Sequence, residues 1–300
     1  MKRLVIFDFY NLLHRSYHAF PREMATSKGV QTNAVYGFIS SLLNTIKELA
    51  PQYVLVASET GPSFRKEQFE DYKATRTWRK KHPDEAEELD KQADCVQKIL
   101  KTMGIPVLNI PKYEADDVVG ALSKKYADSG IEVNIVSNDM DMLQLVNNFV
   151  KVYRKKFYTK DEVLKDFGFG PEKIADYKAL RGDPSDNIPG VYGIGEITAK
   201  RLIKEYGNVE NVYKHINLIS PISLRNKLIA GKESAFMSKG LSLIKSDIPI
   251  DVSLKDAEVK DFNNESVKKI FEEYEFKSLI KKVFPEQKES ADKSQIGLGI

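Results

Sequence analysis

The chain has one cysteine and four histidines among its 300 residues, and its apolar runs are all short. The single cysteine, Cys95, excludes an internal disulfide and favours a reducing compartment. Without sets of Cys and His ligands, a structural zinc site is not expected. No run is long enough to cross a membrane, and the N-terminal residues have the pattern of a strand and not of a signal peptide. We therefore expect a cytoplasmic protein without a membrane partner. The sequence has no signal for oligomerisation, and a monomer is the default expectation.

A strong charge of one sign is also absent. The chain has 46 Lys and Arg against 43 Asp and Glu, a formal net charge of +3. This balance does not by itself indicate a nucleic-acid partner. The distribution is more informative, because acidic residues follow apolar runs and basic residues occupy the segments between them. A hydrophobic content of 42% can fill the core of one large domain or two smaller ones.

Apolar runs alternate with helical patterns over the first half of the chain. Four β-branched runs have the composition of buried parallel strands, namely residues 2–8, 53–57, 106–110 and 130–136. Their alternation with helices predicts an α/β fold with a mainly parallel central sheet flanked by helices. After a predicted strand pair, the second half reads as mostly helical. We expect a first domain of residues 1–168, a helical domain of residues 169–285 and a disordered tail of residues 286–300.

Acidic residues lie where ligands bind in open α/β sheets, just beyond the carboxyl ends of strands. Asp8 ends the first run, and Asp139 and Asp141 follow the fourth. Asp8 by itself suits a helix N-cap equally well. Three more acids open a helix at residues 114–117, where interaction with the helix dipole is the alternative reason for them. The shared position at strand ends favours one acidic site.

A further pair of acids, Asp183 and Asp186, lies in a Gly- and Pro-rich turn within residues 181–195. Brought together, so many carboxylates would repel one another unless a cation neutralised them. Mg²⁺ or Mn²⁺ is the expected cation, and two ions about 4 Å apart would serve phosphodiester hydrolysis. The predicted metal ligands are Asp8, Glu114, Asp116, Asp117, Asp139, Asp141, Asp183 and Asp186.

The same turn continues into a glycine-rich hairpin, residues 190–195, which opens a helix. This pattern is typical of a helix–hairpin–helix, in which glycines let backbone N–H groups approach the phosphates of DNA. A glycine-rich turn with a solvated helix behind it is the alternative. The predicted DNA contacts of this module are Gly190, Gly193, Ile194, Gly195, Lys200 and Arg201.

Basic and aromatic residues are interleaved over residues 64–81. Together they can stack bases and hold phosphates, although a solvated loop has the same composition. Arg65 belongs to this stretch and is a predicted DNA contact. Earlier in the chain, His14 and His18 lie one helical turn apart. Flanking aromatic residues favour packing or substrate contact over a metal pair for these two histidines.

Several stretches together resemble one known family, namely residues 32–38, 64–65, 71–76, 114–117, 139–145 and 181–195. They are similar to the 5′-nuclease (flap endonuclease) family. The resemblance is closest to the 5′→3′ exonuclease domain of bacterial DNA polymerase I, and it extends over about residues 1–285. We accordingly expect a standalone protein of bacterial or phage type.

The resemblance implies a PIN-like core, a helical arch at about residues 77–103 and a hairpin assisted by potassium. It implies a metal-dependent 5′→3′ exonuclease or flap endonuclease. The substrates would be DNA with 5′ flaps, 5′ ends or branched junctions, in replication or repair. By motif, Lys73 and Arg76 would be catalytic contacts of the scissile phosphate, and Tyr72 would stack on or position the DNA.

Two departures from the family pattern bear on catalysis. Ser58 stands where the family usually has an acid at the end of the second strand, and Glu59 follows it. Because side chains alternate faces along a strand, Glu59 replaces that acid only if the strand end bends. Phe9 stands where a glycine usually follows the first aspartate and could crowd the site. A structure-specific DNA-binding paralogue with weakened or lost catalysis is therefore a second hypothesis, and a PIN-type ribonuclease is a third.

Overall fold

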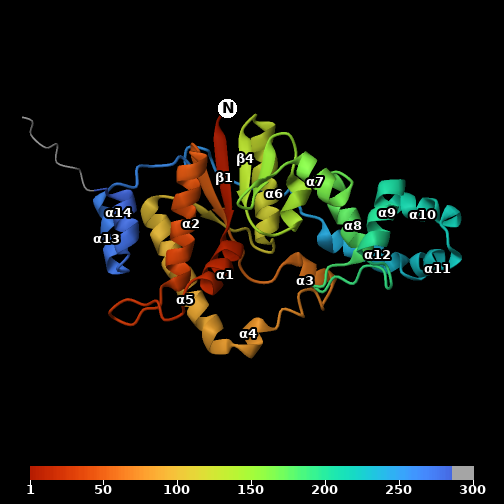
Figure 1. Cartoon of the computed structure of the whole chain (residues 1–300), viewed down its shortest axis with the longest axis horizontal. Coiled ribbons are helices and arrows are strands. Elements are labelled where there is room, and N and C mark those ends of the chain that lie inside the picture. Colours follow the sequence, from red (N-terminus) through yellow and green to blue (C-terminus); the bar gives the residue numbers. More distant parts are fainter. Residues whose placement is uncertain (286–300) are drawn as a thin grey trace, which may run out of the picture.

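The computed structural model describes residues 1–285, and the predicted tail of residues 286–300 lies outside the described residues. Its centre is a six-stranded sheet with the strand order β3-β2-β1-β4-β5-β6 (Figure 1). All neighbouring strands are parallel except β5 and β6. The strands are β1 (Arg3–Asp8), β2 (Tyr53–Ala57), β3 (Val107–Leu108), β4 (Glu132–Val136), β5 (Val150–Tyr153) and β6 (Phe157–Tyr158).

The central strands β1, β2 and β4 are buried along almost their whole length. Helices cover both faces of the sheet, which is why these strands read as continuous apolar runs without alternation. The strand pair predicted after residue 150 forms the antiparallel β5 and β6. The predicted α/β fold with a mainly parallel central sheet is confirmed.

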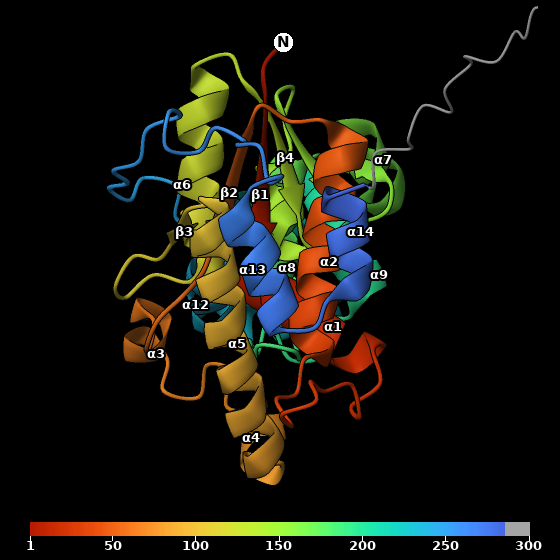
Figure 2. The same cartoon turned by 90° about the vertical axis from the view of Figure 1, so that its left-hand side faces the viewer.

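One face of the sheet packs against α1 (Phe9–Ala19), α2 (Asn33–Leu49) and α5 (Pro83–Met103). The C-terminal helices α13 (Glu265–Glu273) and α14 (Lys277–Val283) lie beside α2 and α5, at the left of Figure 1 and in front in Figure 2. Their apolar side chains belong to the same buried cluster as those of α2 and α5.

This position corrects the expectation that residues 169–285 form one helical domain. Glu258 forms an antiparallel bridge with Tyr53 at the start of β2, so the chain returns to the first domain there. Val267 and Phe271 of α13 are fully buried against that domain. The amphipathic pattern of these helices predicts an apolar face but does not say which core the face joins.

The other face of the sheet is covered by α6 (Ala115–Asp128) and the short 3-10 helix η1 (Asp141–Leu145). One apolar cluster continues from α6 into the helical part of the chain at the right of Figure 1. That part contains α7 (Lys160–Phe167), η2 (Pro171–Lys173), α8 (Ile174–Arg181), α9 (Glu196–Tyr206), α10 (Val209–Lys214), η3 (Ile216–Leu218), α11 (Ile222–Ala230) and α12 (Lys232–Ser242). The shared core holds the helical part directly against the sheet domain.

Two short helices, α3 (Phe64–Gln68) and α4 (Trp78–Lys81), lie between β2 and α5. In Figure 1 they are at the bottom, beyond the carboxyl ends of the strands, and in Figure 2 α4 adjoins the N-terminal end of α5. The predicted arch of residues 77–103 corresponds to α4 and α5, and its passage over DNA stays a prediction. Within residues 1–285, none of the helices combines the length and the hydropathy that a membrane span requires.

Candidate active site

A cleft of about 1150 Å³ opens at the carboxyl ends of the strands. Four acids line it, namely Asp8, Glu59, Asp116 and Asp139. Basic and aromatic side chains from α1 and from residues 73–82 make up much of the remaining lining. The structure thus brings together three of the eight predicted metal ligands, which come from β1, α6 and the loop after β4.

Asp8 is 5% exposed at the end of β1. One carboxylate oxygen accepts the backbone N–H of Asn11 (3.2 Å) and thereby caps α1, and the other accepts the hydroxyl of Ser137 (2.8 Å). Burial raises the pKa of Asp8 to about 6, and the charges of Asp139 and Glu59 also raise it. Both hypotheses for Asp8, a helix cap and a site residue, are compatible with this geometry.

Asp116 and Asp139 are half-buried and face the same cleft. Burial raises the pKa of Asp116 well above its ordinary value, and the charges of Asp139 and Asp8 raise it further. Burial also raises the pKa of Asp139, although the ammonium of Lys178 opposes this shift. Among residues 1–285, no Lys, Arg or His forms an ion pair with these three acids or with Glu59. We call these four residues the uncompensated acids.

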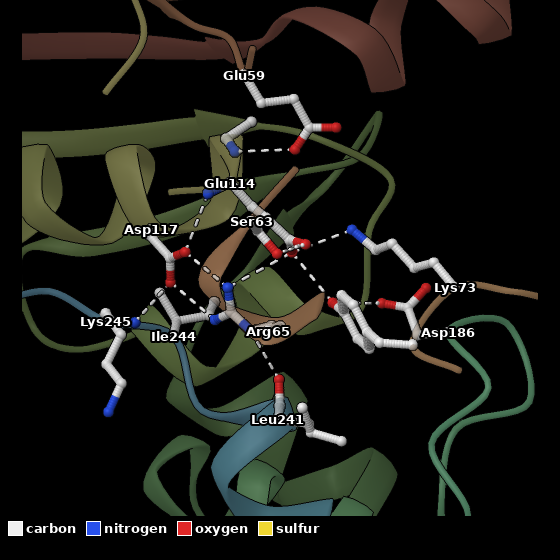
Figure 3. Close-up of polar contacts among 12 residues, drawn as sticks. Glu59, Ser63, Arg65, Lys73, Glu114, Asp117, Asp186, Leu241, Ile244 and Lys245 are labelled. Atoms are coloured by element: carbon white, nitrogen blue, oxygen red, sulfur yellow. Dashed lines mark hydrogen bonds and ion pairs between the residues drawn. The ribbon is translucent and has the colours of Figure 1, made fainter. Parts of the chain in front are cut away.

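Glu59 resolves the question raised by Ser58. β2 ends at Ala57, and the N–H of Ser58 donates to the carbonyl of Leu108 (2.7 Å), so Ser58 remains in the sheet and is 3% exposed. The chain then leaves the strand, and Glu59 lines the cleft. The Glu59 carboxylate accepts the N–H of Ala115 (3.3 Å; Figure 3). An acid therefore reaches the cleft from the second strand, one residue later than the family pattern.

Phe9 does not crowd the cleft. It is the first residue of α1, it is fully buried, and its ring packs against that of Phe38 in α2 with centroids 5.3 Å apart. The expectation of crowding is corrected, because the turn from strand to helix directs this side chain into the apolar core.

A buried lysine accompanies two other predicted metal ligands. Lys178 of α8 is 6% exposed, and its ammonium contacts Asp141 and Asp183, the latter with an Nζ–Oδ2 distance of 2.6 Å. The other oxygen of Asp183 accepts the N–H (2.9 Å) and hydroxyl (2.6 Å) of Ser185. Burial opposes ionisation of Asp183, but Lys178 and Ser185 hold its pKa below the ordinary value. Lys178 was not predicted from the sequence. Its position among the apolar residues of α8 could have indicated a buried lysine that needs an acidic partner.

Glu114 is held by donors from the loop after β2 (Figure 3). Its Oε2 lies 3.0 Å from the Nζ of Lys73 and accepts the hydroxyl of Tyr72 (3.1 Å), and its Oε1 accepts the hydroxyl of Ser63 (2.8 Å). Burial opposes ionisation of Glu114, but the charges of Lys73 and Arg65 hold its pKa below the ordinary value. Lys73 has a positive φ of 57°, which is uncommon for a residue with a side chain. This backbone conformation helps to place Lys73 at the cleft.

Asp117 and Arg65 correct two predicted roles. They form a bidentate ion pair (Nη1–Oδ2 2.7 Å, Nη2–Oδ1 2.8 Å; Figure 3), and they are 0% and 2% exposed. Arg65 also donates to the carbonyls of Leu241 and Leu243, and Asp117 accepts two backbone N–H groups. Every polar atom of both side chains is used inside the fold. In this conformation Asp117 is therefore not available to a metal, nor Arg65 to DNA.

Tyr72 also departs from its predicted role in stacking. It is 4% exposed, and its hydroxyl lies within hydrogen-bond distance of Glu114 (3.1 Å) and Asp186 (3.2 Å). Burial raises the pKa of Tyr72, so the hydroxyl remains a donor. Arg76 lines the cleft and pairs with the other oxygen of Asp186. Tyr72 thus positions two acids that come from distant parts of the sequence.

The turn that carries Asp183 and Asp186 is closed by contact between two glycines. Gly182 and Gly190 have φ angles of 79° and 62°, and a Cβ on Gly190 would lie 2.2 Å from the backbone nitrogen of Gly182. An antiparallel bridge between Asp183 and Ile188 closes the inner part of the turn. Glycine at both positions is therefore a condition for placing these acids beside the cleft.

The hairpin that follows leads into α9. Gly193 has a φ of 75°, and Gly195 is the N-cap of α9, whose first-turn N–H groups have no partner within the helix. Ile194 is 4% exposed, so only its backbone is available to a ligand. Lys200 pairs with an acid one turn earlier in α9, whereas Arg201 is exposed. The hairpin residues lie apart from the cleft lining, and their contact with DNA stays a prediction.

Trp78 of α4 is surrounded by other rings at the cleft. The rings of His14 and His18 are perpendicular to it at centroid distances of 5.9 Å, and that of His82 is stacked on it at 5.9 Å. Trp78 and these three histidines line the cleft. The predicted packing or substrate contact of His14 and His18 fits this arrangement. Sequence reasoning did not connect these histidines with Trp78, because they come from different helices.

The cleft has the donor chemistry of a divalent-metal site. The uncompensated acids offer only oxygen ligands, and their mutual repulsion favours a bound cation. Within residues 1–285, no three Asp, Glu, His or Cys side chains are placed to hold one ion together. Protein cations and backbone donors instead hold the other predicted ligands. The residues fit a metal ion in chemistry, and side-chain rotation would be needed to close them around it.

Comparison with known proteins agrees with this architecture. Residues 3–168 match the 5'-3' exonuclease, N-terminal resolvase-like domain, and residues 169–265 match the 5'-3' exonuclease, C-terminal SAM fold. The two matches together extend over most of the chain.

Similar proteins include DNA polymerases and a shorter nuclease. The chain is 41% identical over 291 residues to the DNA polymerase I of Caldicellulosiruptor bescii, covering 94% of this chain and 33% of that protein. It is 39% identical over 287 residues to the 5'-3' exonuclease of Aquifex aeolicus, covering 94% of this chain and 96% of that protein. The chain therefore spans about a third of the polymerase and nearly all of the Aquifex exonuclease.

Solved structures share the fold at low sequence identity. A flap endonuclease of bacteriophage T5, in a complex with DNA and metal ions, has a TM-score of 0.70 and 22% identity, covering 92% of this chain and 98% of that one. The catalytic core of Rad2 in complex with DNA substrate has a TM-score of 0.57 and 15% identity, covering 94% and 93%. At these identities the likeness concerns the fold alone.

Proposed function

This chain belongs to the 5'-3' exonuclease family, and from that premise we propose that it is a metal-dependent, structure-specific nuclease. Its substrates would be DNA with 5′ flaps, 5′ ends or branched junctions, in replication or repair. One observation carries the proposal: Asp8, Asp116 and Asp139 lie in the cleft without an ion pair to any described residue, and Lys73 and Arg76 line the same cleft. Acids that have no ion-pair partner, beside two cations at the edge of the same cleft, suit a metal ion together with a phosphate.

Mg²⁺ or Mn²⁺ would be the metal, because the donors are oxygens only. We propose one ion at the uncompensated acids and a second at Asp141, Asp183 and Asp186. Two such ions, when bound, supply an activated water and stabilise the leaving oxygen of a phosphodiester. The relatives of known structure include complexes with divalent metal ions, which supports the metal requirement in general.

Lys73 and Arg76 would contact the scissile phosphate. Their ion pairs with Glu114 and Asp186 hold both cations at the edge of the cleft. Charged N–H donors in such a position stabilise the negative charge that develops on a phosphate during hydrolysis. The hydroxyl of Tyr72 lies within hydrogen-bond distance of both carboxylates and can donate its single proton to either, which helps to hold them beside the two cations.

The hairpin would hold the duplex on one side of the cut. Backbone N–H groups at Gly193, Gly195 and the first turn of α9 suit phosphate contact without sequence readout. Arg201 would add a charged contact. We include a potassium ion at this hairpin in the proposal.

Trp78 would contact the unpaired 5′ strand. Aromatic side chains beside cations bind single-stranded nucleic acid by stacking and by phosphate contact, and Arg79 and Lys81 lie beside Trp78 in the cleft lining. Duplex DNA cannot offer an unstacked base to this surface. The aromatic lining therefore favours a substrate with a free 5′ strand.

The observations favour an active nuclease over a DNA-binding paralogue. Glu59 supplies an acid from the end of β2, and Phe9 is buried in the core. The two departures that motivated the paralogue hypothesis thus leave the cleft lining acidic. We propose that the protein acts as a monomer.

The test is cleavage of a duplex with a 5′ flap, labelled at its 5′ end, with Mg²⁺, with Mn²⁺ and with a chelator. A duplex without the flap and a single-stranded RNA serve as comparison substrates. We expect metal-dependent release of the flap and little cleavage of RNA. Trp78 is the only tryptophan, so its fluorescence reports flap binding in Ca²⁺ independently of cleavage. Flap binding without cleavage in any metal would contradict the proposal and favour the paralogue.

A further inference from the structure

Lys178 occupies an unusual position for a lysine. It is 6% exposed in the middle of α8, where its neighbours Tyr177, Ala179 and Leu180 are buried in the apolar core. A buried ammonium is costly unless charged partners surround it. Here the partners are two of the predicted metal ligands, and the ammonium contacts both.

The ammonium of Lys178 lies between one carboxylate oxygen of Asp141 and one of Asp183. Nζ contacts Oδ1 of Asp141 and lies 2.6 Å from Oδ2 of Asp183. The remaining oxygen of Asp183 is occupied by Ser185. Lys178 therefore uses the oxygen of Asp183 that would be free to bind a metal. A cation between two carboxylates from separate segments has the place and the charge sign of a bridging metal ion.

The uncompensated acids have no equivalent of Lys178. Asp8, Asp116 and Asp139 line the cleft without an ion pair among the described residues, whereas Asp141 and Asp183 both contact the ammonium of Lys178. The two parts of the acidic region thus differ in what a first metal ion would encounter. At the uncompensated acids it would meet carboxyl groups that have no ion-pair partner, and at Asp141 and Asp183 it would have to displace an ammonium.

We propose that the ammonium of Lys178 takes the place of the second divalent cation in the metal-free protein, so that a second ion binds only after Lys178 withdraws. The inference rests on the proposed metal-dependent function. It makes Lys178 a positioning residue that keeps Asp141 and Asp183 together before metal arrives, and it makes the second ion bind more weakly than the first.

Lys178→Met tests the proposal because methionine keeps the apolar stem and removes the charge. In a chelator, the variant should have a lower Tm than wild type, since Asp141 and Asp183 would repel each other unopposed. In a calorimetric titration with Mn²⁺ alone, the second ion should bind at least about tenfold more tightly, because competition with a unit charge a few ångströms away is removed. Lys178→Arg keeps the charge and should retain weak binding of the second ion.

Lys165→Met is the matched control, since it removes one positive charge from an exposed position on α7. It should change neither the metal-free Tm nor the binding of the second ion. If Lys178→Met does not fold, Lys178→Gln replaces it, because glutamine can still donate to both carboxylates without carrying a charge. The prediction for the second ion is the same.

Two results overturn the inference. Binding of two Mn²⁺ ions with unchanged or weaker second-site affinity in Lys178→Met would mean that the lysine does not compete with metal. An unchanged metal-free Tm would mean that it does not hold the two acids together. Absence of any Mn²⁺ binding in wild type would instead contradict the proposed function itself, and cleavage activity is not needed for any of these readouts.

Discussion

The acids at the end of the sheet fall into two regions that differ in how their charge is neutralised. Asp8, Glu59, Asp116 and Asp139 line the open cleft, and the described residues supply no ion pair to any of them. The other acids are paired with protein cations and are almost fully buried: Glu114, Asp117, Asp141, Asp183 and Asp186. We call these five the paired acids. Burial is common to both regions, but only the paired acids form an ion pair with a protein cation.

The difference follows from where the neighbouring cations come from. Lys178 of α8 and the basic loop of Arg65, Lys73 and Arg76 all approach from the side of the helical part. The pKa of Glu114 and that of Asp183 are accordingly lowered, while those of Asp8 and Asp116 are raised. Paired acids stabilise the fold, whereas unpaired acids in a cleft weaken it unless a ligand binds. One acidic cluster can thus stabilise the fold through its paired members and bind a ligand through its unpaired members.

The largest expected effect concerns the most buried pair. Arg65→Met leaves the carboxylate of Asp117 buried without a counter-charge, and loss of one partner of such a pair costs about 3–5 kcal/mol. Urea denaturation should show this decrease in the free energy of unfolding. Arg79→Met is the control, since the pair of Arg79 with Asp90 is exposed and contributes about 1 kcal/mol or less. Equal effects of the two variants would contradict the assignment of Arg65 to the fold.

Among the uncompensated acids, a neutral substitution should have opposite effects on activity and stability. Asp116→Asn removes a proposed metal ligand, and we expect cleavage to fall by about 10²–10³-fold, as for loss of an electrostatic contact in an active site. Because burial raises the pKa of Asp116, its charge costs stability at neutral pH, so the variant should have a higher metal-free Tm. Flap cleavage and thermal unfolding in a chelator measure the two effects.

Asp161→Asn changes an exposed acid of α7 by the same chemistry and serves as the control. It should change neither the rate of flap cleavage nor the metal-free Tm. If Asp116→Asn instead lowers the metal-free Tm, the charge of Asp116 stabilises the fold. Asp116 would then belong with the paired acids, contrary to the division made above.

The free energy of unfolding should also depend on pH through the uncompensated acids. The pKa of Asp8 is raised from 3.8 to about 6, so folding favours its protonated form. This contribution is complete below pH 3.8 and is lost as the pH rises through about 6, and it corresponds to about 3 kcal/mol. We expect Asp8→Asn to lack this loss when unfolding free energies are measured from pH 4 to 7 without metal. Parallel curves for wild type and Asp8→Asn would contradict the assignment.

The smallest expected effect separates Glu59 from its neighbour. Glu59→Gln removes a charge that lines the cleft but leaves an oxygen, and we expect about a tenfold loss of cleavage, as for residues that support metal ligands. Ser58→Ala should leave cleavage unchanged, because Ser58 remains in the sheet and is not part of the cleft lining. Steady-state cleavage at several Mg²⁺ concentrations measures both variants. A larger loss in Ser58→Ala would reverse the roles assigned to these two residues.

Sequence patterns predicted regular elements well where local signals agreed. Residues 53–57 form β2 with the predicted bounds, because a short apolar β-branched run is a strong local signal. The position of α13 was not predictable in the same way. Its apolar face is local information, but its packing against α5 depends on contacts with residues distant in the sequence.

The residues of the candidate site also divide into those that local sequence patterns predict and those that depend on contacts between distant parts of the chain. The acids of the site were predictable from their positions after strands and in the glycine-rich turn. Their partners were not: Arg65 of α3 meets Asp117 of α6 although the two are far apart in the sequence, and Lys178 reaches Asp141 only because the helical part folds onto the sheet domain. For the same reason Tyr72, which reads as an exposed aromatic in a basic stretch, is buried between Glu114 and Asp186.

The sequence alone therefore determined the fold class, the family and the identity of most acids at the site, because strand composition, helix periodicity and turn chemistry are local properties. Only the tertiary structure decided which of these acids are neutralised by the protein and which lie free in the cleft. Electrostatic compensation depends on distances of a few ångströms between side chains far apart in the chain, and Coulomb interactions in a buried region change steeply over such distances. That is why Asp116 and Asp117, which are adjacent in the sequence, have opposite environments.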